Sequence, residues 1–439
     1  MKTNTENLSS TTPPIFILCC ERSGSSLLRY ILDTHPDIAS PAELNLAKLC
    51  RSLYVFIEST MGQISSWSEE SQKKHAIAEE VRQIIFSVMT KYAKSKNKLM
   101  WCEKSPSNID NVAWLETVFP DSKYICLHRH AMDVVQSCLE ATKYSFMPEQ
   151  LSYVCRNSGN IVGAMLENWI VKTKALLEFE KKHKTQCFRI KYESYVLNPG
   201  LSLGTMFEFL NVSWDESLLE KVFSVQHDGG FEDQKLQFSQ SIHSRSIGKG
   251  ATIKRRFIPN DLLGQMNELL AELDYPIVDT NWDSVLSLDN QLNSDSTLET
   301  LTSTLEDIFT QIFPPRLQEL KEALERNPVI YQIIVVGKNA GIWTIDLTKP
   351  KNQISKEKAE RNADCVARVS AKDLVELVNG NTNPVELQMQ EKLQITGDAK
   401  LAEIFCLFLV GRLQSYQSSV SCWWQRHSTD IEESHKSAL

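Results

Sequence analysis

The chain lacks the features that mark secreted, membrane-spanning and nucleic-acid-binding proteins. The stretch MKTNTENLSSTTPP has no apolar core of the signal-peptide type, and the longest apolar stretch, IFCLFLVG, is far short of a membrane span. The formal net charge of −8 over 439 residues argues against nucleic acid as a general partner. We therefore expect a cytoplasmic globular protein with no membrane span, in which any bound anion is captured locally.

Metal-ligand and disulfide patterns are also missing, although the chain has eleven cysteines. Their spacings fit neither a zinc site nor a disulfide framework, and several lie in apolar runs, such as Cys19, Cys126 and Cys406. His128 and His130 invite a metal interpretation, but no third ligand follows at a useful spacing. The sequence predicts a reduced compartment, no metal site and a structural role for both histidines.

Length and composition predict two domains. At 439 residues the chain is too long for one ordinary core, and 42% hydrophobic with 23% charged residues is typical of a globular protein. A stretch rich in Ser, Asn and Asp suits a linker. We predict a disordered tail, a first domain, a linker, a second domain and a C-terminal tail, at residues 1–13, 14–283, 284–297, 298–425 and 426–439.

The first domain alternates strand-like and helical patterns. Short apolar runs bounded by polar residues cover 14–20, 98–104, 123–129 and 186–192. The alternation predicts an α/β fold, a P-loop-like parallel sheet flanked by helices, with ligands bound beyond the carboxyl ends of the strands. Polar clusters at those ends are therefore the candidate sites.

The first of these strands runs into the polar sequence CCERSGSS. A strand, a tight turn at Gly24 and a helix from Ser25 bring backbone N–H groups together, as in anion-binding loops. Ser23 and Ser26 add hydroxyl groups, and Arg22 supplies the positive charge. The first glycine and the lysine of the nucleoside-triphosphatase loop are absent. The pattern predicts a loop for a phosphate-like anion, with an ordinary turn and a capping serine as the alternative.

A second polar cluster follows the third predicted strand. Arg129 ends that strand, and Ser137 lies eight residues on, in the next helix. Together with the first loop, this pattern resembles the sulfotransferase family over roughly residues 14–280. That family uses 3′-phosphoadenosine 5′-phosphosulfate as sulfuryl donor. The resemblance implies that Arg22 to Ser26 bind the 5′-phosphosulfate and that Arg129 and Ser137 bind the 3′-phosphate.

The same resemblance assigns further site residues. The Arg22 loop resembles most the tyrosylprotein, bacterial and polyketide-associated branches of the family, and Glu43 falls 21 residues after Arg22, where those branches have a carboxylate base. Lys104 in CEKSPSN matches a lysine that helps bind the sulfuryl group. Tyr192 in RIKYESYVLNP matches a Tyr-Glu step near the nucleotide. Arg22, Glu43 and Lys104 are the implied catalytic residues. From the sequence alone, a surface loop or helix-cap carboxylate is the simpler interpretation of Glu43.

A late segment, SIHSRSIGKGATIKRRF, is basic in an acidic chain. Between Asp233 and Asp261 there are six basic residues and no acidic one. The resemblance implies a late donor-binding loop here with contacts from Ser244, Arg245 and Lys249. A solvated basic loop is the alternative.

The second domain has an α+β pattern. A helical pattern covers 298–325, the runs VIYQIIVVG and AGIWTIDL around KNAG predict a hairpin, and helical spacing returns at 371–379 and 401–413. Residues 362–405, with ADC, GNTNP and ITGD in order, resemble the sterol carrier protein type 2 family. The resemblance implies a lipid-binding tunnel and makes Cys365 a small buried residue. A domain that only packs or dimerises is the alternative.

Taken together, the two resemblances predict a sulfotransferase that uses 3′-phosphoadenosine 5′-phosphosulfate without a metal. Its expected acceptor is a hydroxylated lipid or an acyl group, and an acyl carrier protein is a possible partner in a variant that sulfonates a carrier-bound β-hydroxyacyl chain. A nonenzymatic lipid-binding protein with a degenerate nucleotide fold and a P-loop kinase are the other classes considered. The sequence does not predict the oligomeric state.

Overall fold

The computed structural model describes most of the chain. The described residues are 12–61, 69–142, 148–157, 159–228, 236, 238–284, 305–324, 327–337, 341–351, 353–359, 361–382, 384–411 and 413. The predicted linker from residue 285, the C-terminal tail and the N-terminal tail up to residue 11 lie outside them.

The chain forms two compact units that are interleaved in sequence. The N-terminal unit takes residues 1–222, 227–232 and 242–291, and the C-terminal unit takes 223–226, 233–241 and 292–439. A short piece of the chain upstream of residue 242 therefore belongs to the C-terminal unit.

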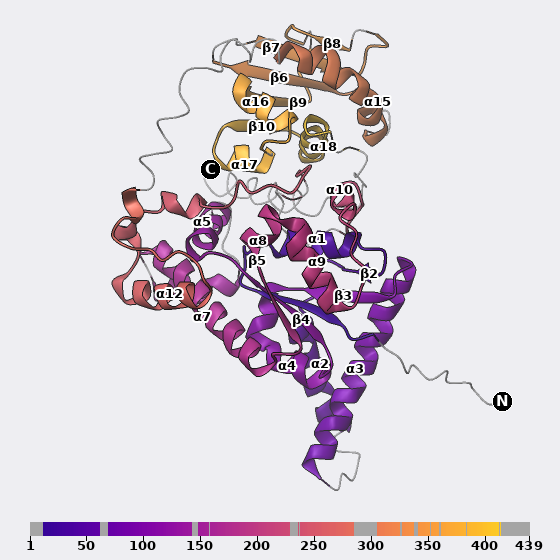
Figure 1. Ribbon diagram of the computed structural model, residues 1–439. Coiled ribbons are helices and arrows are strands. Elements are labelled where there is room, and N and C mark those ends of the chain that lie inside the picture. Colours follow the sequence, from indigo (N-terminus) through magenta and orange to yellow (C-terminus); the bar gives the residue numbers. More distant parts are fainter. Residues whose placement is uncertain are drawn as a thin grey trace, which may run out of the picture. The chain divides into compact units, whose positions relative to one another are not determined.

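The N-terminal unit is built on a five-stranded parallel sheet, as predicted (Figure 1). Its strand order is β2-β3-β1-β4-β5, with β1 at the centre. The strands are β1 (Ile15–Cys19), β2 (Ile38–Ala39), β3 (Met100–Lys104), β4 (Lys123–His128) and β5 (Cys187–Lys191). Four of them fall within the predicted runs, whereas β2 has only two residues and leaves no periodic pattern to detect.

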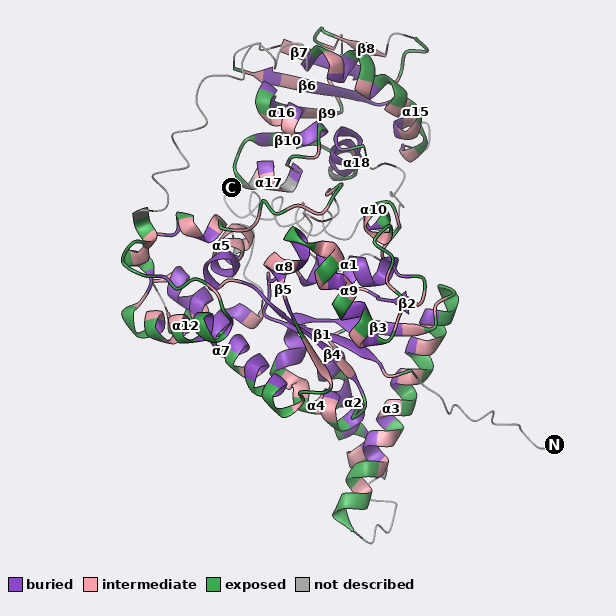
Figure 2. Ribbon diagram, viewed as in Figure 1, coloured by how far each residue is buried: buried purple, intermediate pink, exposed green. Residues whose placement is uncertain are grey.

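Helices cover the sheet and bury its central strands (Figure 2). One apolar cluster joins Phe16 and Leu18 of β1 to α2, α3 and α4, and another joins α5, α7 and α12. The helices are α1 (Ser25–Thr34), α2 (Leu46–Met61), α3 (Glu70–Ser95), α4 (Val112–Val118), α5 (Ala131–Thr142), α6 (Leu151–Arg156), α7 (Ile161–Lys182), α8 (Tyr192–Leu197), α9 (Pro199–Leu210), α10 (Leu218–Lys221) and α12 (Asn260–Glu272). Among the helices that the structure describes, none is long and apolar enough to cross a membrane.

The C-terminal unit has a mixed five-stranded sheet of order β10-β9-β6-β7-β8. β6 and β9 are parallel, and the other pairs are antiparallel. The strands are β6 (Ile330–Val336), β7 (Gly341–Asp346), β8 (Ile354–Ser355), β9 (Cys365–Ser370) and β10 (Leu393–Gly397). The predicted hairpin is confirmed as β6 and β7, and its turn at 338–340 lies outside the described residues.

Helices pack against this second sheet to complete an α+β fold, as predicted. They are a π-helical turn η6 (Ile308–Ile312), α15 (Phe313–Ala323), α16 (Ala371–Val378), α17 (Pro384–Met389) and α18 (Ala399–Leu409). Phe405 of α18 stacks on Tyr331 of β6 with ring centroids 4.3 Å apart. Phe238, from the upstream piece of chain, is part of the same apolar core.

Candidate active site

The loop between β1 and α1 has a backbone that favours glycine. Arg22 has φ 64° and Gly24 has φ 93°, and α1 begins directly afterwards at Ser25. A Cβ on Gly24 would lie 2.3 Å from Cδ2 of Tyr192, and the Tyr195 hydroxyl donates to the Gly24 carbonyl at 2.8 Å. Gly24 itself is the N-cap, and no side chain caps the helix. The capping serine of the alternative interpretation is therefore not found at this helix.

The two arginines predicted to bind the donor are brought together. Arg22 donates from Nε to the Ser137 hydroxyl at 3.1 Å, and Arg129 donates from Nη1 to the Arg22 carbonyl at 2.8 Å. The Arg129 guanidinium lies 4.3 Å from the centroid of the Tyr192 ring. The ends of β1, β4 and β5 thus place Arg22, Arg129, Ser137 and Tyr192 in one cluster.

Two buried polar atoms in this cluster suit an anionic ligand. Within the described part of the chain, the Ser23 hydroxyl and Nε of Arg129 have no hydrogen-bond partner although both are buried. A buried polar group without a partner is costly, and an anionic ligand that reached either atom would remove that cost. The residues present therefore fit a phosphate-containing donor.

The second cluster joins Lys104 to Glu43. Lys104 ends β3, which pairs with β1 so that Ile17 lies opposite Lys104. The fully buried Lys104 ammonium lies 2.5 Å from Oε1 of Glu43 and donates to the Ser26 hydroxyl at 3.2 Å. Glu43 keeps 17% of its side chain exposed. A carboxylate beside this loop is a side chain of the type that acts as a general base.

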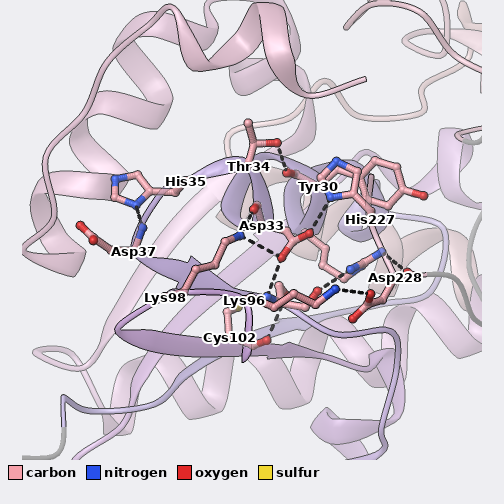
Figure 3. Close-up of polar contacts among 12 residues, drawn as sticks. Tyr30, Asp33, Thr34, His35, Asp37, Lys96, Lys98, Cys102, His227 and Asp228 are labelled. Carbon is pink, nitrogen blue, oxygen red and sulfur yellow. Dashed lines mark hydrogen bonds and ion pairs between the residues drawn. The ribbon is translucent and has the colours of Figure 1, made fainter. Parts of the chain in front are cut away.

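Polar contacts anchor the far end of α1 beside the segment that leads to Glu43 (Figure 3). Asp33 accepts from the Ser40 amide at 2.9 Å, lies 3.3 Å from the Lys98 ammonium and bonds Nδ1 of His227 at 2.6 Å. Burial acts to raise the pKa of Asp33, but the bond to His227 and the charge of Lys98 outweigh it, so the pKa is below its usual value. Asp33 thus ties α1 to the chain just after β2.

The late basic segment is held through hydrogen bonds between its backbone groups and the side chains of Arg129 and Asp133. Arg129 donates from Nη2 to the Ser246 carbonyl at 2.6 Å. The buried Asp133 of α5 accepts from the amides of Gly248 at 2.8 Å and Gly250 at 2.7 Å. A Cβ on Gly250 would lie 2.3 Å from the backbone carbon of Met132. Of the predicted contacts in this segment, Ser244 and Arg245 are exposed and Lys249 is half-buried.

His128 and His130 have structural partners. His130 accepts from the Met132 amide at Nδ1 (3.2 Å), and its Nε2 lies 3.0 Å from the Pro276 carbonyl. Its side chain therefore caps the N-terminus of α5. His128 bonds Glu180 at 2.7 Å. In the described ranges no group of three or more His, Cys, Asp and Glu residues could hold a metal ion.

The cysteines beside the loop have no nucleophilic role. Burial raises the pKa of Cys19 to about 12 and the pKa of Cys20 well above its usual value, because a thiolate is poorly solvated there. In the C-terminal unit, Cys365 is fully buried, as expected, and burial raises its pKa to about 12.

Sequence reasoning missed the acidic residues that hold the site loops. Glu103, Asp133 and Glu193 are neighbours of predicted site residues, and each accepts a backbone N–H from another segment. Glu103 lies in CEKSPSN and Glu193 in RIKYESYVLNP, but the partners of all three residues lie far away in sequence. Only the fold brings them together.

A parallel sheet with an anion loop after its central strand, and an ion-paired carboxylate beside that loop, defines an α/β group-transfer enzyme. Residues 13–216 match the model of the sulfotransferase family, and residues 309–405 match that of the SCP-2 sterol transfer family. Residues 13–216 thus form a sulfotransferase-family domain, and residues 309–405 form a domain of the SCP-2 sterol transfer family. The predicted resemblance to both families is confirmed.

Individual relatives are distant. Protein-tyrosine sulfotransferase 2 of Gallus gallus is 24% identical over 282 residues, which cover 61% of this chain and 70% of that protein. Protein-tyrosine sulfotransferase A of Caenorhabditis elegans is 21% identical over 266 residues, covering 60% and 67%.

Two solved structures align with the two units. The sulfotransferase domain from the curacin biosynthetic pathway has a TM-score of 0.46 at 23% identity and covers 61% of this chain and 100% of that domain. The sterol carrier protein domain 2 of Helicoverpa armigera has a TM-score of 0.23 at 21% identity, covering 26% and 92%.

Proposed function

We propose that the chain transfers a sulfuryl group from 3′-phosphoadenosine 5′-phosphosulfate to the hydroxyl of a lipid-like or acyl acceptor, and that the C-terminal unit binds the apolar part of that acceptor. The observation that carries the proposal is the contact of the Lys104 ammonium with both Ser26 of the anion loop and Glu43. It puts a cation and a carboxylate at the end of the loop where the transferred group would lie.

In this proposal the N-terminal unit binds the donor at two ends. Arg22, the backbone of Ser23 to Ser26 and Lys104 would hold the phosphosulfate, and Arg129, Ser137 and the 244–249 segment would hold the 3′-phosphate. Tyr192 would pack near the nucleotide against Arg129, whose guanidinium it already contacts. The unpartnered Ser23 hydroxyl and Arg129 Nε support this assignment.

The reaction needs charge stabilisation and removal of one proton. Bound donor supplies an activated sulfuryl group: its S–O bond to phosphate breaks, a new S–O bond forms to the acceptor oxygen, and adenosine 3′,5′-bisphosphate leaves. Lys104 and Arg22 would stabilise negative charge on the oxygens around sulfur, as cations do in phosphoryl transfer. Glu43 would take the hydroxyl proton, which requires hydrogen-bond reach to the acceptor oxygen.

The Lys104–Glu43 pair would then change partners during catalysis. With donor bound, the ammonium turns from Glu43 to the sulfuryl oxygens, and Glu43 is released to accept from the acceptor hydroxyl. The exposed edge of Glu43 gives the acceptor access, while the buried Lys104 stays on the donor side.

The test is incubation of the full chain with sulfur-labelled donor and four acceptor classes: long-chain alcohols and sterols, a carrier-protein-bound 3-hydroxyacyl chain, a tyrosine peptide and simple phenols. We expect label in one of the first two classes and competition by adenosine 3′,5′-bisphosphate. Label confined to the peptide or phenols would overturn the acceptor class. Competition by ATP alone, or no binding of the donor, would overturn the activity.

Glu43→Gln separates the proposed roles. Loss of a general base lowers turnover by about 10²- to 10⁴-fold while donor affinity stays within about twofold. Equal loss of turnover and donor affinity would instead assign Glu43 a structural role.

A further inference from the structure

Strand β3 ends in two charged residues, Glu103 and Lys104, whose side chains contact different groups. Lys104 reaches Ser26 and Glu43, as described above. Glu103, one residue earlier, is also fully buried. Its Oε1 accepts from the Leu44 amide at 3.0 Å, directly beside Glu43 in the chain. One strand end therefore contacts both the Glu43 side chain and the backbone that carries it.

The carboxylate of Glu103 is held by the turn that follows β3. The Ser105 hydroxyl donates to Oε1 at 2.5 Å, and Nδ2 of Asn108 donates to Oε2 at 2.5 Å. These three partners leave both carboxylate oxygens bonded inside the protein. The side chain is thus fixed by a satisfied buried network.

The same turn binds the rest of the Glu43 loop. The Ser105 oxygen accepts from the Asn45 amide at 2.9 Å, and Oδ1 of Asn108 accepts from the Ala47 amide at 3.1 Å. Asn45 has φ 53°, a left-handed conformation that is uncommon for a residue with a side chain. Side chains of the 103–108 segment therefore accept hydrogen bonds from three backbone amides around this bend, those of Leu44, Asn45 and Ala47.

Burial of the Glu103 carboxylate carries a desolvation cost for the folded state. Burial raises the pKa of Glu103 above its usual value even though its three hydrogen bonds act to lower it. An apolar side chain of similar size would fill the space without that desolvation cost. A buried carboxylate that points at a loop amide is therefore better explained by placement of the loop than by packing of the core.

We propose that Glu103 is a positioning residue that fixes the loop bearing Glu43 beside the end of β3, where the Glu43 carboxylate can reach the acceptor hydroxyl. The inference rests on the proposed function, in which Glu43 takes the acceptor proton. Proton transfer needs a base within hydrogen-bond reach, and a displacement of about 1 Å can cost on the order of 100-fold in rate. In this proposal Glu103 sets the distance from the Glu43 carboxylate to the acceptor oxygen, and it does so without touching the substrate.

Glu103→Gln is the direct test because it keeps the size of the side chain. The Gln oxygen can still accept from Leu44 and Ser105, but its NH₂ group faces Nδ2 of Asn108, and two donors repel. We expect faster amide hydrogen exchange in the 44–47 peptide and a fall in kcat of about tenfold or more. The Kd for adenosine 3′,5′-bisphosphate should stay within about twofold, and Tm at pH 7 should fall by a few degrees at most, because only one hydrogen bond of the network is lost.

Two further variants sharpen the result. Ser105→Ala removes the acceptor of the Asn45 amide and should give a smaller change of the same kind, which keeps the test open if Glu103→Gln does not fold. Glu167→Gln is the control for a Glu-to-Gln change, since Oε2 of Glu167 in α7 accepts from the Asn157 side-chain amide at 2.5 Å and Oε1 pairs with Arg156, away from the Glu43 loop. It should leave kcat and the 44–47 exchange unchanged.

The outcomes are distinguishable from failure of the proposed function. Unchanged 44–47 exchange in Glu103→Gln, or unchanged kcat with faster exchange, would overturn the positioning role. So would a parallel loss of Tm, kcat and nucleotide binding, which would make the residue merely structural. If the wild-type chain neither binds adenosine 3′,5′-bisphosphate nor labels any acceptor, the proposed function fails, and the exchange measurement still decides whether Glu103 holds the loop.

Discussion

At the scale of single residues, the site is defined by which charged groups have partners and which do not. Lys104 and Glu43 neutralise each other at 2.5 Å, and Arg22 reaches Ser137. Nε of Arg129 is buried without a hydrogen-bond partner in the described part of the chain. The site therefore holds charged side chains whose hydrogen bonds and ion pairs an anionic ligand would replace.

Replacing Arg22 tests the donor side. Arg22→Ala should weaken adenosine 3′,5′-bisphosphate binding by about 10- to 100-fold, the range expected for loss of a charge-assisted hydrogen bond. Titration calorimetry measures the change. The exposed Arg361 of the C-terminal unit offers a control, and Arg361→Ala should bind the nucleotide like the wild type. Equal binding by the two variants would remove Arg22 from the donor site.

Glu403 gives a prediction about pH. Burial raises the pKa of this α18 carboxyl to about 7, and its Oε2 has no hydrogen-bond partner among the described residues. The protonated form is thus favoured by folding. The corresponding stability is fully present below the unfolded pKa, about 4.3, and is lost as pH rises through about 7.

Glu403→Gln should therefore stabilise the C-terminal unit at pH 8, by about 3 kcal/mol at most, and change it little near pH 4. Calorimetric melting at the two pH values measures this difference. An equal effect of the substitution at both pH values would contradict the titration of Glu403 as the cause.

At the scale of elements, the site is a set of strand ends with loops attached. The strand patterns predicted β1, β3, β4 and β5, and the Gly24 turn predicted where α1 begins, because these signals are local. The contacts that lock the loops join residues far apart in sequence, such as Asp133 with Gly250 and Glu103 with Leu44. No local pattern encodes such pairs, so the sequence alone could not predict which residues support the loops.

Asp133 should hold the late loop on α5. Asp133→Asn leaves one acceptor oxygen for two amides, those of Gly248 and Gly250. We expect faster hydrogen exchange across 246–252 and a loss of adenosine 3′,5′-bisphosphate affinity of about three- to tenfold. The exposed Asp121 provides the control variant Asp121→Asn. Native exchange in this segment of Asp133→Asn would show that other contacts suffice.

At the scale of the whole molecule, the two units are compact but not consecutive. Residues 233–241 belong to the C-terminal unit although the chain on either side, 227–232 and 242–291, belongs to the N-terminal one. Phe238 lies in the C-terminal core, and Nε2 of Gln240 donates to the Val410 carbonyl at the end of α18. The stability of the second unit therefore depends on residues that sequence inspection assigns to the first.

Phe238→Ala should lower the stability of the C-terminal unit by about 3 to 5 kcal/mol, as expected for truncation of a buried aromatic residue. Calorimetry detects which unfolding transition shifts to lower temperature. Hydrogen exchange of β6 and β9 then shows whether that transition is the unfolding of the C-terminal unit. Phe257, which is 47% exposed in the N-terminal unit, supplies the control variant Phe257→Ala with little effect. Destabilisation of the N-terminal unit instead would contradict the placement of Phe238.

The interleaving has a consequence for how such a chain can be inherited or engineered. A genetic crossover between residues 241 and 305 would seem to exchange one complete module for another. It would instead leave Phe238 and Gln240 behind with the N-terminal half and deliver a C-terminal half that lacks part of its core. The two halves are therefore expected to be shuffled as a pair, and a chimera would need the 233–241 stretch transplanted with its distant partner.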